Sequence, residues 1–312
     1  MTLPLFDPPP PHFDRGALAS RLRTLANEGI WIGTSSWKYE GWLDQIYTRE
    51  RYQTRGRFSK KAFEAECLAE YAQTFPVVCG DFSFYQFPTP EYWQRLFGSS
   101  PQHLHFALKV PEEVTAEVFP KHARYGPRAG IPNDSYLNAD ALAAMFLEPL
   151  RPYASRVSVL IFEFGPRGAG FREFMAALEP FLARLPEGFR YAVEVRNREY
   201  LQPRYFETLR ARGVAHVMNS WTRMPPLAEQ ASLPTPADFT VVRALLRAGR
   251  AYEDAVARFQ PYNKIGDENP ETRNALREWI RRMREERRTS YIFVNNRLEG
   301  NAPETIRAVV EE

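Results

Sequence analysis

The stretch Tyr191-Ala192-Val193-Glu194-Val195-Arg196 contains the pattern that decides the fold of this 312-residue chain. It is a short apolar run with two charges placed two residues apart, so both charges lie on one face of a β-strand. Similar apolar runs that finish in polar residues recur along the chain, as in residues 30–36 and 291–296. Helical stretches separate these runs, which predicts a parallel sheet with crossover helices.

Eight such strands can be placed along the chain. They cover residues 30–34, 77–83, 104–110, 157–164, 190–196, 214–219, 239–245 and 291–296. Eight strand–helix units of this spacing predict an α/β fold, a TIM-type (β/α)8 barrel that forms one domain over residues 15–312. Residues 1–14 contain five prolines, and we expect them to form an extended tail outside the barrel.

Composition excludes several classes of protein. Hydrophobic residues make up 44% and charged residues 25% of the chain, which is ordinary for a globular protein. The net charge of +3 argues neither for nor against a nucleic-acid partner. Cys67 and Cys79 are too few for a disulfide framework and are expected to be buried free thiols. Because we find no export or membrane-crossing segment, we expect a cytoplasmic protein with no membrane partner.

The charged face of residues 190–196 is expected to point into the barrel, near the mouth at the carboxyl ends of the strands. Glu194 and Arg196 share this face, and Glu163 occupies the equivalent place on the preceding strand. Paired carboxylates can divide into general acid and base. The structural alternative is that these charges form buried ion pairs that hold the barrel together.

Cations from other strands are expected at the same mouth. Lys109, Arg196 and Arg243 would converge around Glu163 and Glu194, with Asp81 contributed by the second predicted strand. Converging Lys and Arg side chains suit a carboxylate or phosphate ligand. Charge compensation of the three acidic residues is an equally good interpretation.

Other residues at the strand ends are candidate ligand contacts. Asn295, Asn296 and the turn 300–302 precede the last helix, where amide groups favour an anion; the alternative is a helix cap without a ligand. Ser35 ends the first strand, and Trp37 and Tyr85 belong to aromatic segments that stack on ligands or, more often, pack as loop anchors.

Two basic segments are also candidates. The long loop 111–137 is a possible lid and carries Lys121, His122, Arg124, Tyr125 and Arg128. The helix near residues 271–286 and the residues after it are rich in arginine. Because glutamates are interleaved there, a solvated helix face is the favoured interpretation over a docking surface.

Motifs for known cofactors are missing from the sequence. The five histidines show no His-x-x-x-His spacing, and there is no Cys-x-x-Cys pair, no Gly-x-Gly-x-x-Gly and no Gly-x-Ser-x-Gly. The sequence therefore identifies no cofactor and no metal-ligand set.

Several of these motifs together resemble one known family. They are residues 32–39 with Trp42, Phe82-Ser83-Phe84-Tyr85, residues 106–109, residues 193–196, and Asn295-Asn296 with Gly300 and Ala302. In this combination the chain resembles the domain of unknown function 72 family, also called YecE-like, over about residues 30–312. The resemblance implies a TIM-type barrel and no settled reaction. The chain departs from the family pattern at residues 79–83, 163–166 and near Asn219-Ser220.

Three functional hypotheses follow from these observations. The first is binding of, or acid–base chemistry on, a small phosphorylated or carboxylated compound, with Glu194, Glu163 and Lys109 as the catalytic group. The second is a metal-dependent phosphodiesterase or endonuclease-like enzyme with metal at Asp81, Glu163 and Glu194. The third is a non-catalytic nucleic-acid binder that uses the loop 111–137 and the arginine-rich helix.

Overall fold

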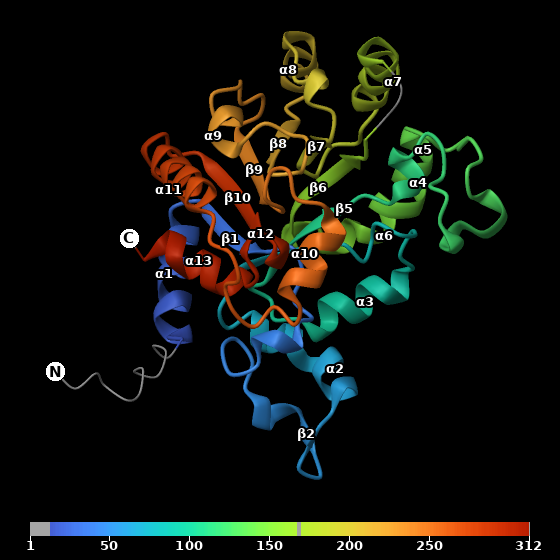
Figure 1. Ribbon diagram of the computed structural model, residues 1–312. Helices are drawn as coiled ribbons and strands as arrows, with labels where there is room; N and C mark the ends of the chain where they lie inside the picture. The colour runs from blue at the N-terminus through green and yellow to red at the C-terminus, as the bar shows by residue number, and fades with distance from the viewer. Residues whose placement is uncertain (1–12, 167–169, 312) are drawn as a thin grey trace.

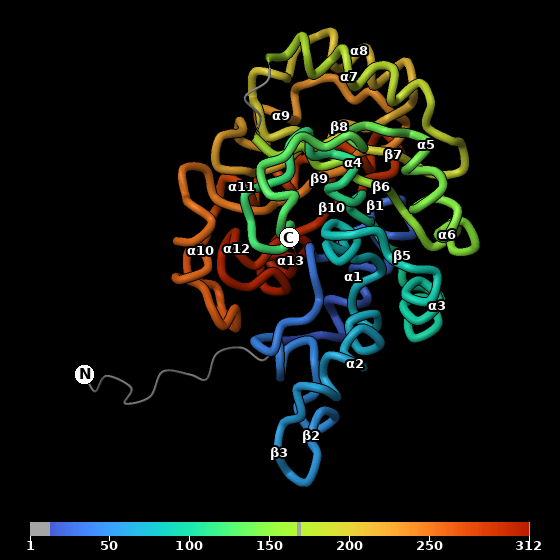
Figure 2. The backbone as a smooth tube through the Cα atoms, turned by 90° about the vertical axis from the view of Figure 1, so that its right-hand side faces the viewer, coloured from blue at the N-terminus to red at the C-terminus, as the bar shows by residue number. Residues whose placement is uncertain are grey.

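The computed structural model describes residues 13–166 and 170–311, and within them the chain forms a closed eight-stranded parallel barrel (Figure 1). The barrel strands are β1 (Ile30–Thr34), β4 (Val77–Gly80), β5 (His105–Lys109), β6 (Val157–Phe164), β7 (Tyr191–Val195), β8 (Ala215–Asn219), β9 (Phe239–Ala244) and β10 (Thr289–Val294). Each predicted strand corresponds to one of these, so the TIM-type prediction is confirmed. Strands β2 (Gln53–Thr54) and β3 (Arg57–Phe58) form a separate hairpin that projects from the barrel (Figures 1 and 2).

Helices surround the barrel. They are α1 (Arg15–Asn27), α2 (Lys60–Tyr71), α3 (Pro90–Ser99), α4 (Glu112–Thr115), α5 (Ala139–Leu142), α6 (Glu148–Leu150), α7 (Phe171–Ala183), α8 (Pro203–Arg210), α9 (Leu227–Gln230), α10 (Tyr252–Phe259), α11 (Pro270–Glu285), α12 (Asn296–Glu299) and α13 (Ala302–Val310). The start of α3 follows the expected capping chemistry: the Thr89 side chain accepts a hydrogen bond from the Tyr92 amide, with Pro90 as the first residue of the helix. Among the described residues, no helix combines the length and the apolar character needed to span a bilayer.

The N-terminal segment needs one correction. The predicted tail falls mainly on residues 1–12, which lie outside the described residues. Phe13 is buried, however, and the Asp14 side chain accepts a hydrogen bond from the Ala17 amide at the start of α1. These two residues belong to the barrel domain because one contributes apolar surface to the core and the other caps a helix.

The barrel interior has an apolar base and a charged end. Alternate residues of the strands fill it, and the buried apolar set comprises Val77, Cys79, Ala107, Val159, Ile161, Ala192, Ala215, Val217, Val241, Tyr291 and Phe293. In several strands the alternation then places a charged residue further toward the carboxyl end on the same face, as in Ala192, Glu194 and Arg196. The face predicted for residues 190–196 is therefore the observed one.

Barrel closure depends on a short seam between β1 and β4. Register pairs there are Gly33 with Val77 and Thr34 with Val78, fewer than between β1 and β10. The Tyr71 hydroxyl bridges the seam, because it accepts a hydrogen bond from the Thr34 amide and donates to the Val77 carbonyl, both at 3.0 Å. A Cβ on Gly33 would lie 1.9 Å from that carbonyl oxygen, so this position requires glycine.

The segment 111–137, which follows β5, contains regular structure. It contains α4 and a 3₁₀ segment, Ala123–Arg128, and Figure 1 shows it in green as a long excursion away from the strands, beside α4 and α5. The Glu112 carboxylate accepts hydrogen bonds from Arg124 and from the Tyr125 hydroxyl, and thereby fixes the two arms of the loop to each other. We keep the name lid for residues 111–137.

Candidate functional site

Six charged side chains meet inside the barrel at its carboxyl end, and we call them the mouth cluster. They are Asp81 after β4, Lys109 in β5, Glu163 in β6, Glu194 in β7, Arg196 directly after β7, and Arg243 in β9. Glu163 and Glu194 are register partners in neighbouring strands, and Asn219 of β8 is level with Arg243. Three cations thus face three carboxylates, so the mouth cluster has no formal net charge.

Glu163 is the centre of the cluster. Its Oε2 atom lies 3.1 Å from Lys109 Nζ, 3.2 Å from Arg196 Nη2 and 2.6 Å from Arg243 Nη1. Its side chain is 15% exposed and lines a neighbouring cavity. Three cations on one oxygen make Glu163 the acceptor that holds the other strands' side chains together.

Glu194, the register partner of Glu163, is fully buried. Its Oε1 lies 2.7 Å from Arg196 Nη2, and its Oε2 accepts a hydrogen bond from Arg243 Nη1. A charge without solvent contact is tolerable only when it is paired, which these two guanidinium groups achieve. In this arrangement the carboxylate has no open approach for a ligand.

The electrostatics of the cluster shift the pKa values of three of its members, Glu163, Lys109 and Arg243. Burial alone would raise the pKa of Glu163, but Lys109, Arg196 and Arg243 outweigh burial and hold that pKa well below its usual range. Burial would lower the pKa of Lys109, yet Asp81 and Glu163 outweigh it and raise that pKa. The same competition between burial and Glu194 leaves the pKa of Arg243 raised. At neutral pH Glu163 is therefore a carboxylate and Lys109 an ammonium ion.

Asp81 is the most loosely held carboxylate of the cluster. Its Oδ1 lies 3.4 Å from Lys109 Nζ and 3.9 Å from Arg243 Nη2, longer than the ion pairs of Glu163. Its side chain is 35% exposed, whereas those of Lys109 and Arg243 are buried. Moving Asp81 into solvent would therefore disturb the cluster less than moving either glutamate.

Neighbouring side chains set the positions of the cations. Lys109 Nζ lies 3.9 Å from the ring centroid of Phe84, and the Arg196 guanidinium lies 4.2 Å from that of Trp221. Arg196 also donates a hydrogen bond to the Oδ1 atom of the fully buried Asn219 at 3.3 Å. Asn219 and Trp221 are site neighbours that were not predicted from the sequence. The inward alternation of Ala215, Val217 and Asn219 was the signal that could have identified Asn219.

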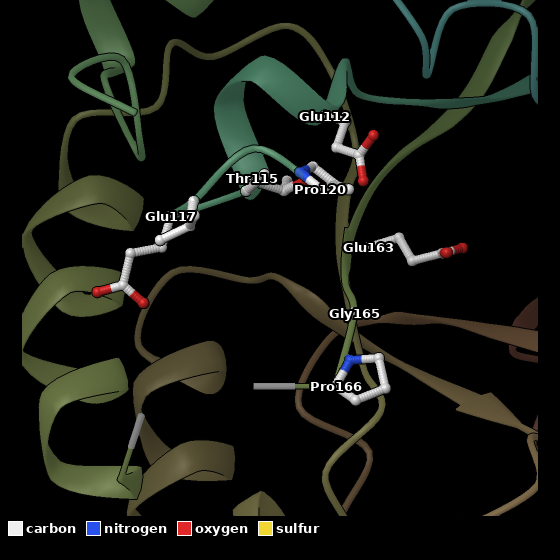
Figure 3. Close-up of a pocket in the computed structure, with 9 residues that line it drawn as sticks. Glu112, Thr115, Glu117, Pro120, Glu163, Gly165 and Pro166 are labelled. Atoms are coloured by element: carbon white, nitrogen blue, oxygen red, sulfur yellow. The ribbon is translucent and has the colours of Figure 1, made fainter. Parts of the chain in front are cut away.

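A cavity of about 240 Å³ adjoins the cluster. Its walls are the start of the lid and the end of β6: Glu112, Thr115, Ala116, Glu117, Val118, Pro120, Glu163, Gly165 and Pro166. Figure 3 shows the Glu112 and Glu163 side chains on one side of β6, with the Glu117 carboxylate directed away from them. The lining offers carboxylate acceptors, so it suits the hydroxyl or ammonium groups of a ligand.

The amide side chains after β10 serve helix starts. The Asn295 Oδ1 atom accepts a hydrogen bond from the Arg297 amide, and the Asn296 Oδ1 atom accepts from the Ala302 amide and from Trp42 Nε1. Asn301 caps α13 through the Glu304 amide. The capping alternative accounts for these contacts, and anion binding by Asn295 and Asn296 stays a prediction.

The remaining predicted contacts lie apart from the ion pairs. Ser35 is buried, and its Oγ atom has no hydrogen-bond partner among the described residues. Trp37 is buried against the edge of Phe82 at 5.8 Å between ring centroids, which matches its interpretation as a loop anchor. Tyr85 is exposed, and Arg124 of the lid stacks on it at 4.6 Å.

The geometry gives little support to the metal hypothesis. Lys109 and Arg243 stand between Asp81, Glu163 and Glu194, so a divalent cation among these carboxylates would meet two fixed positive charges. Within residues 13–166 and 170–311, no three acidic, histidine or cysteine side chains converge as a metal-binding group.

The basic segments are also largely neutralised. On α11, Arg281 pairs with Glu278 and Glu285, and Arg282 with Glu286. In the lid, Arg124 pairs with Glu112. Arginines that are already paired with carboxylates attract the phosphates of a nucleic acid only weakly.

Comparison with known proteins places the chain among uncharacterised relatives. The family described as "Protein of unknown function DUF72" matches residues 31–312. The UPF0759 protein YecE of Escherichia coli K12 is 23% identical over 291 residues, which cover 91% of this chain and 92% of that protein. Crystal structures of DUF72 family proteins from Enterococcus faecalis and Thermotoga maritima are each 17% identical, with TM-scores of 0.60 and 0.59. They cover 91% and 90% of this chain, and 96% and 97% of those proteins, and support the barrel fold.

Proposed function

The chain belongs to the DUF72 family of proteins of unknown function, and from that premise we propose that it binds a small carboxylated compound at the mouth of the barrel. The observation that carries this proposal is that the three carboxylates of the mouth cluster differ in ion-pair distance and in exposure. Glu194 and Glu163 are held at short distances, while Asp81 is partly exposed and loosely paired. An entering carboxylate takes the place of Asp81 against Lys109 and Arg243.

The body of the ligand lies in the cavity beneath the lid. Glu163 lines that cavity and also contacts Lys109 and Arg243, so the two regions are continuous through one side chain. A volume of about 240 Å³ is below the range of about 300–1,000 Å³ common for drug-sized ligands, which favours a small molecule. The carboxylate lining favours a molecule that carries hydroxyl or ammonium donors besides its acidic group.

Binding is favoured over proton transfer as the main role of the cluster. A general acid at neutral pH requires a raised carboxyl pKa, and the pKa of Glu163 is shifted downward by three cations. The raised pKa of Lys109 likewise removes it as a base. We therefore assign Glu163 and Glu194 to fixing Arg196 and Arg243, and Lys109 with Arg243 to holding the ligand. Two buried free cysteines fit a reducing compartment such as the cytoplasm.

Substitution of Asp81 tests the proposal, because the proposal predicts that the affinity for a carboxylate rises rather than falls. Asp81→Asn leaves Lys109 and Arg243 short of one carboxylate, so we expect binding of gluconate, a hydroxylated carboxylate probe, to become about tenfold tighter by titration calorimetry. Lys109→Met should weaken the same binding by a similar factor.

The matched control is Asp140→Asn, because Asp140 is an exposed aspartate that pairs with Arg184 at 2.6 Å. This variant should leave the affinity for gluconate unchanged. Weaker gluconate binding in Asp81→Asn, or equal binding in Asp81→Asn and Lys109→Met, would refute the exchange of carboxylates.

A further inference from the structure

Three arginines surround an open groove after β9, and we call it the arginine groove. The groove has a volume of about 700 Å³ and is lined by Arg247, Ala248, Gly249, Arg250, Asp254, Ala257 and Arg258. It lies on the loop that follows the seventh strand of the barrel and on one side of α10. Loops after the seventh and eighth strands are where (β/α)8 barrels often hold phosphate groups.

One carboxylate already occupies the centre of these arginines. Arg247 Nη1 lies 3.0 Å from Asp267 Oδ1, Arg250 pairs with Asp267 Oδ2, and Arg258 Nη2 lies 3.9 Å from the same oxygen. Asp254 is the other acidic group at the groove. Three guanidinium groups against two carboxylates leave an excess of one positive charge, in contrast to the balanced mouth cluster.

Two of the arginines lie against an aromatic ring, and Arg250 is the more deeply buried of the two. The guanidinium groups of Arg250 and Arg258 lie 5.1 Å and 5.9 Å from the ring centroid of Phe259. The Arg250 side chain is 15% exposed, and its Nη1 atom is buried without a hydrogen-bond partner among the described residues. A fixed guanidinium donor without an acceptor is a group that a bound oxyanion or water would satisfy.

We propose that the arginine groove binds the phosphoryl group of a small phosphorylated molecule. The three arginines present forked donors around one point, which suits a tetrahedral oxyanion. A nucleic-acid strand would need a continuous basic stripe, but Asp254 lines the groove and Asp267 pairs with its arginines. This proposal is independent of carboxylate binding at the mouth, because the two sites share no residue.

Titration with inorganic phosphate and glycerol 3-phosphate at constant ionic strength tests the proposal. Arg258→Gln removes the most exposed and most loosely paired arginine, so it should preserve the fold and weaken phosphate binding about fivefold. Asp267→Asn removes the competing carboxylate and should tighten phosphate binding by a similar factor. Arg204→Gln is the matched control, because Arg204 is an exposed arginine that pairs with Glu179 outside the groove.

Each outcome decides the question. Phosphate affinity that is the same in wild type, Arg258→Gln and Asp267→Asn would overturn the proposal. Tighter binding of a short single-stranded oligonucleotide than of glycerol 3-phosphate, lost in Arg258→Gln, would show a nucleic-acid site instead. Lys109→Met separates the two sites, since it should weaken gluconate binding and leave the phosphate response of Arg258→Gln and Asp267→Asn intact.

Discussion

Replacement of Glu194 by glutamine removes one charge from the mouth cluster while preserving the shape of the side chain. Glu194 is fully buried and is paired with Arg196 and Arg243. Each pair represents about 4 kcal/mol of attraction at 4 Å and an effective dielectric constant of 20. The variant leaves three cations facing two carboxylates, so an uncompensated positive charge remains in the barrel.

Part of this lost attraction is offset, because burying a neutral glutamine costs less free energy than burying an ionised carboxylate. Removal of one partner from a buried ion pair destabilises proteins by about 3–5 kcal/mol, and we expect Glu194→Gln to lower the free energy of unfolding by that amount at pH 7. The measurement is urea unfolding of wild type and variant, where the midpoint should fall while the dependence on urea stays the same.

Glu278→Gln is the control for this experiment. Glu278 lies on the surface of α11, is 69% exposed and pairs with Arg281 at 2.5 Å. Its substitution should change the free energy of unfolding by less than about 1 kcal/mol. If Glu194→Gln also changes that free energy by less than about 1 kcal/mol, the mouth cluster is well solvated and the reasoning about its carboxylates is wrong.

Two further predictions concern the cluster and the closure of the barrel. The pKa of Glu163 is lower in the folded than in the unfolded chain, so its stabilising contribution is complete above the unfolded value of about 4.3 and is lost as pH falls through the folded value. Acid unfolding below about pH 4.3 should therefore be shallower in Glu163→Gln than in wild type when the free energy of unfolding is measured against pH. Gly33→Ala should destabilise the barrel by about 3 kcal/mol, because its Cβ would meet the Val77 carbonyl oxygen at 1.9 Å; a change below about 1 kcal/mol in urea unfolding would show that the β1–β4 seam can shift.

The sequence determined the architecture because strand patterns are local. The apolar runs and their polar ends place all eight barrel strands, and the alternation of Ala192, Glu194 and Arg196 indicates which face points inward. A period of two residues fixes side-chain direction without any knowledge of neighbouring strands. For this reason the convergence of charged residues at one end of the barrel could be inferred from the chain alone.

Only the tertiary structure decided which charged side chains form ion pairs and at what distances. Register between strands and the closure of the barrel bring Arg243 to both glutamates and leave Asp81 at longer distances from its partners. The arginine groove likewise depends on Asp267 folding back against Arg247 and Arg250. These distances arise between segments far apart in the chain, and electrostatic energy depends on separation and burial, which a linear pattern of residue types does not contain.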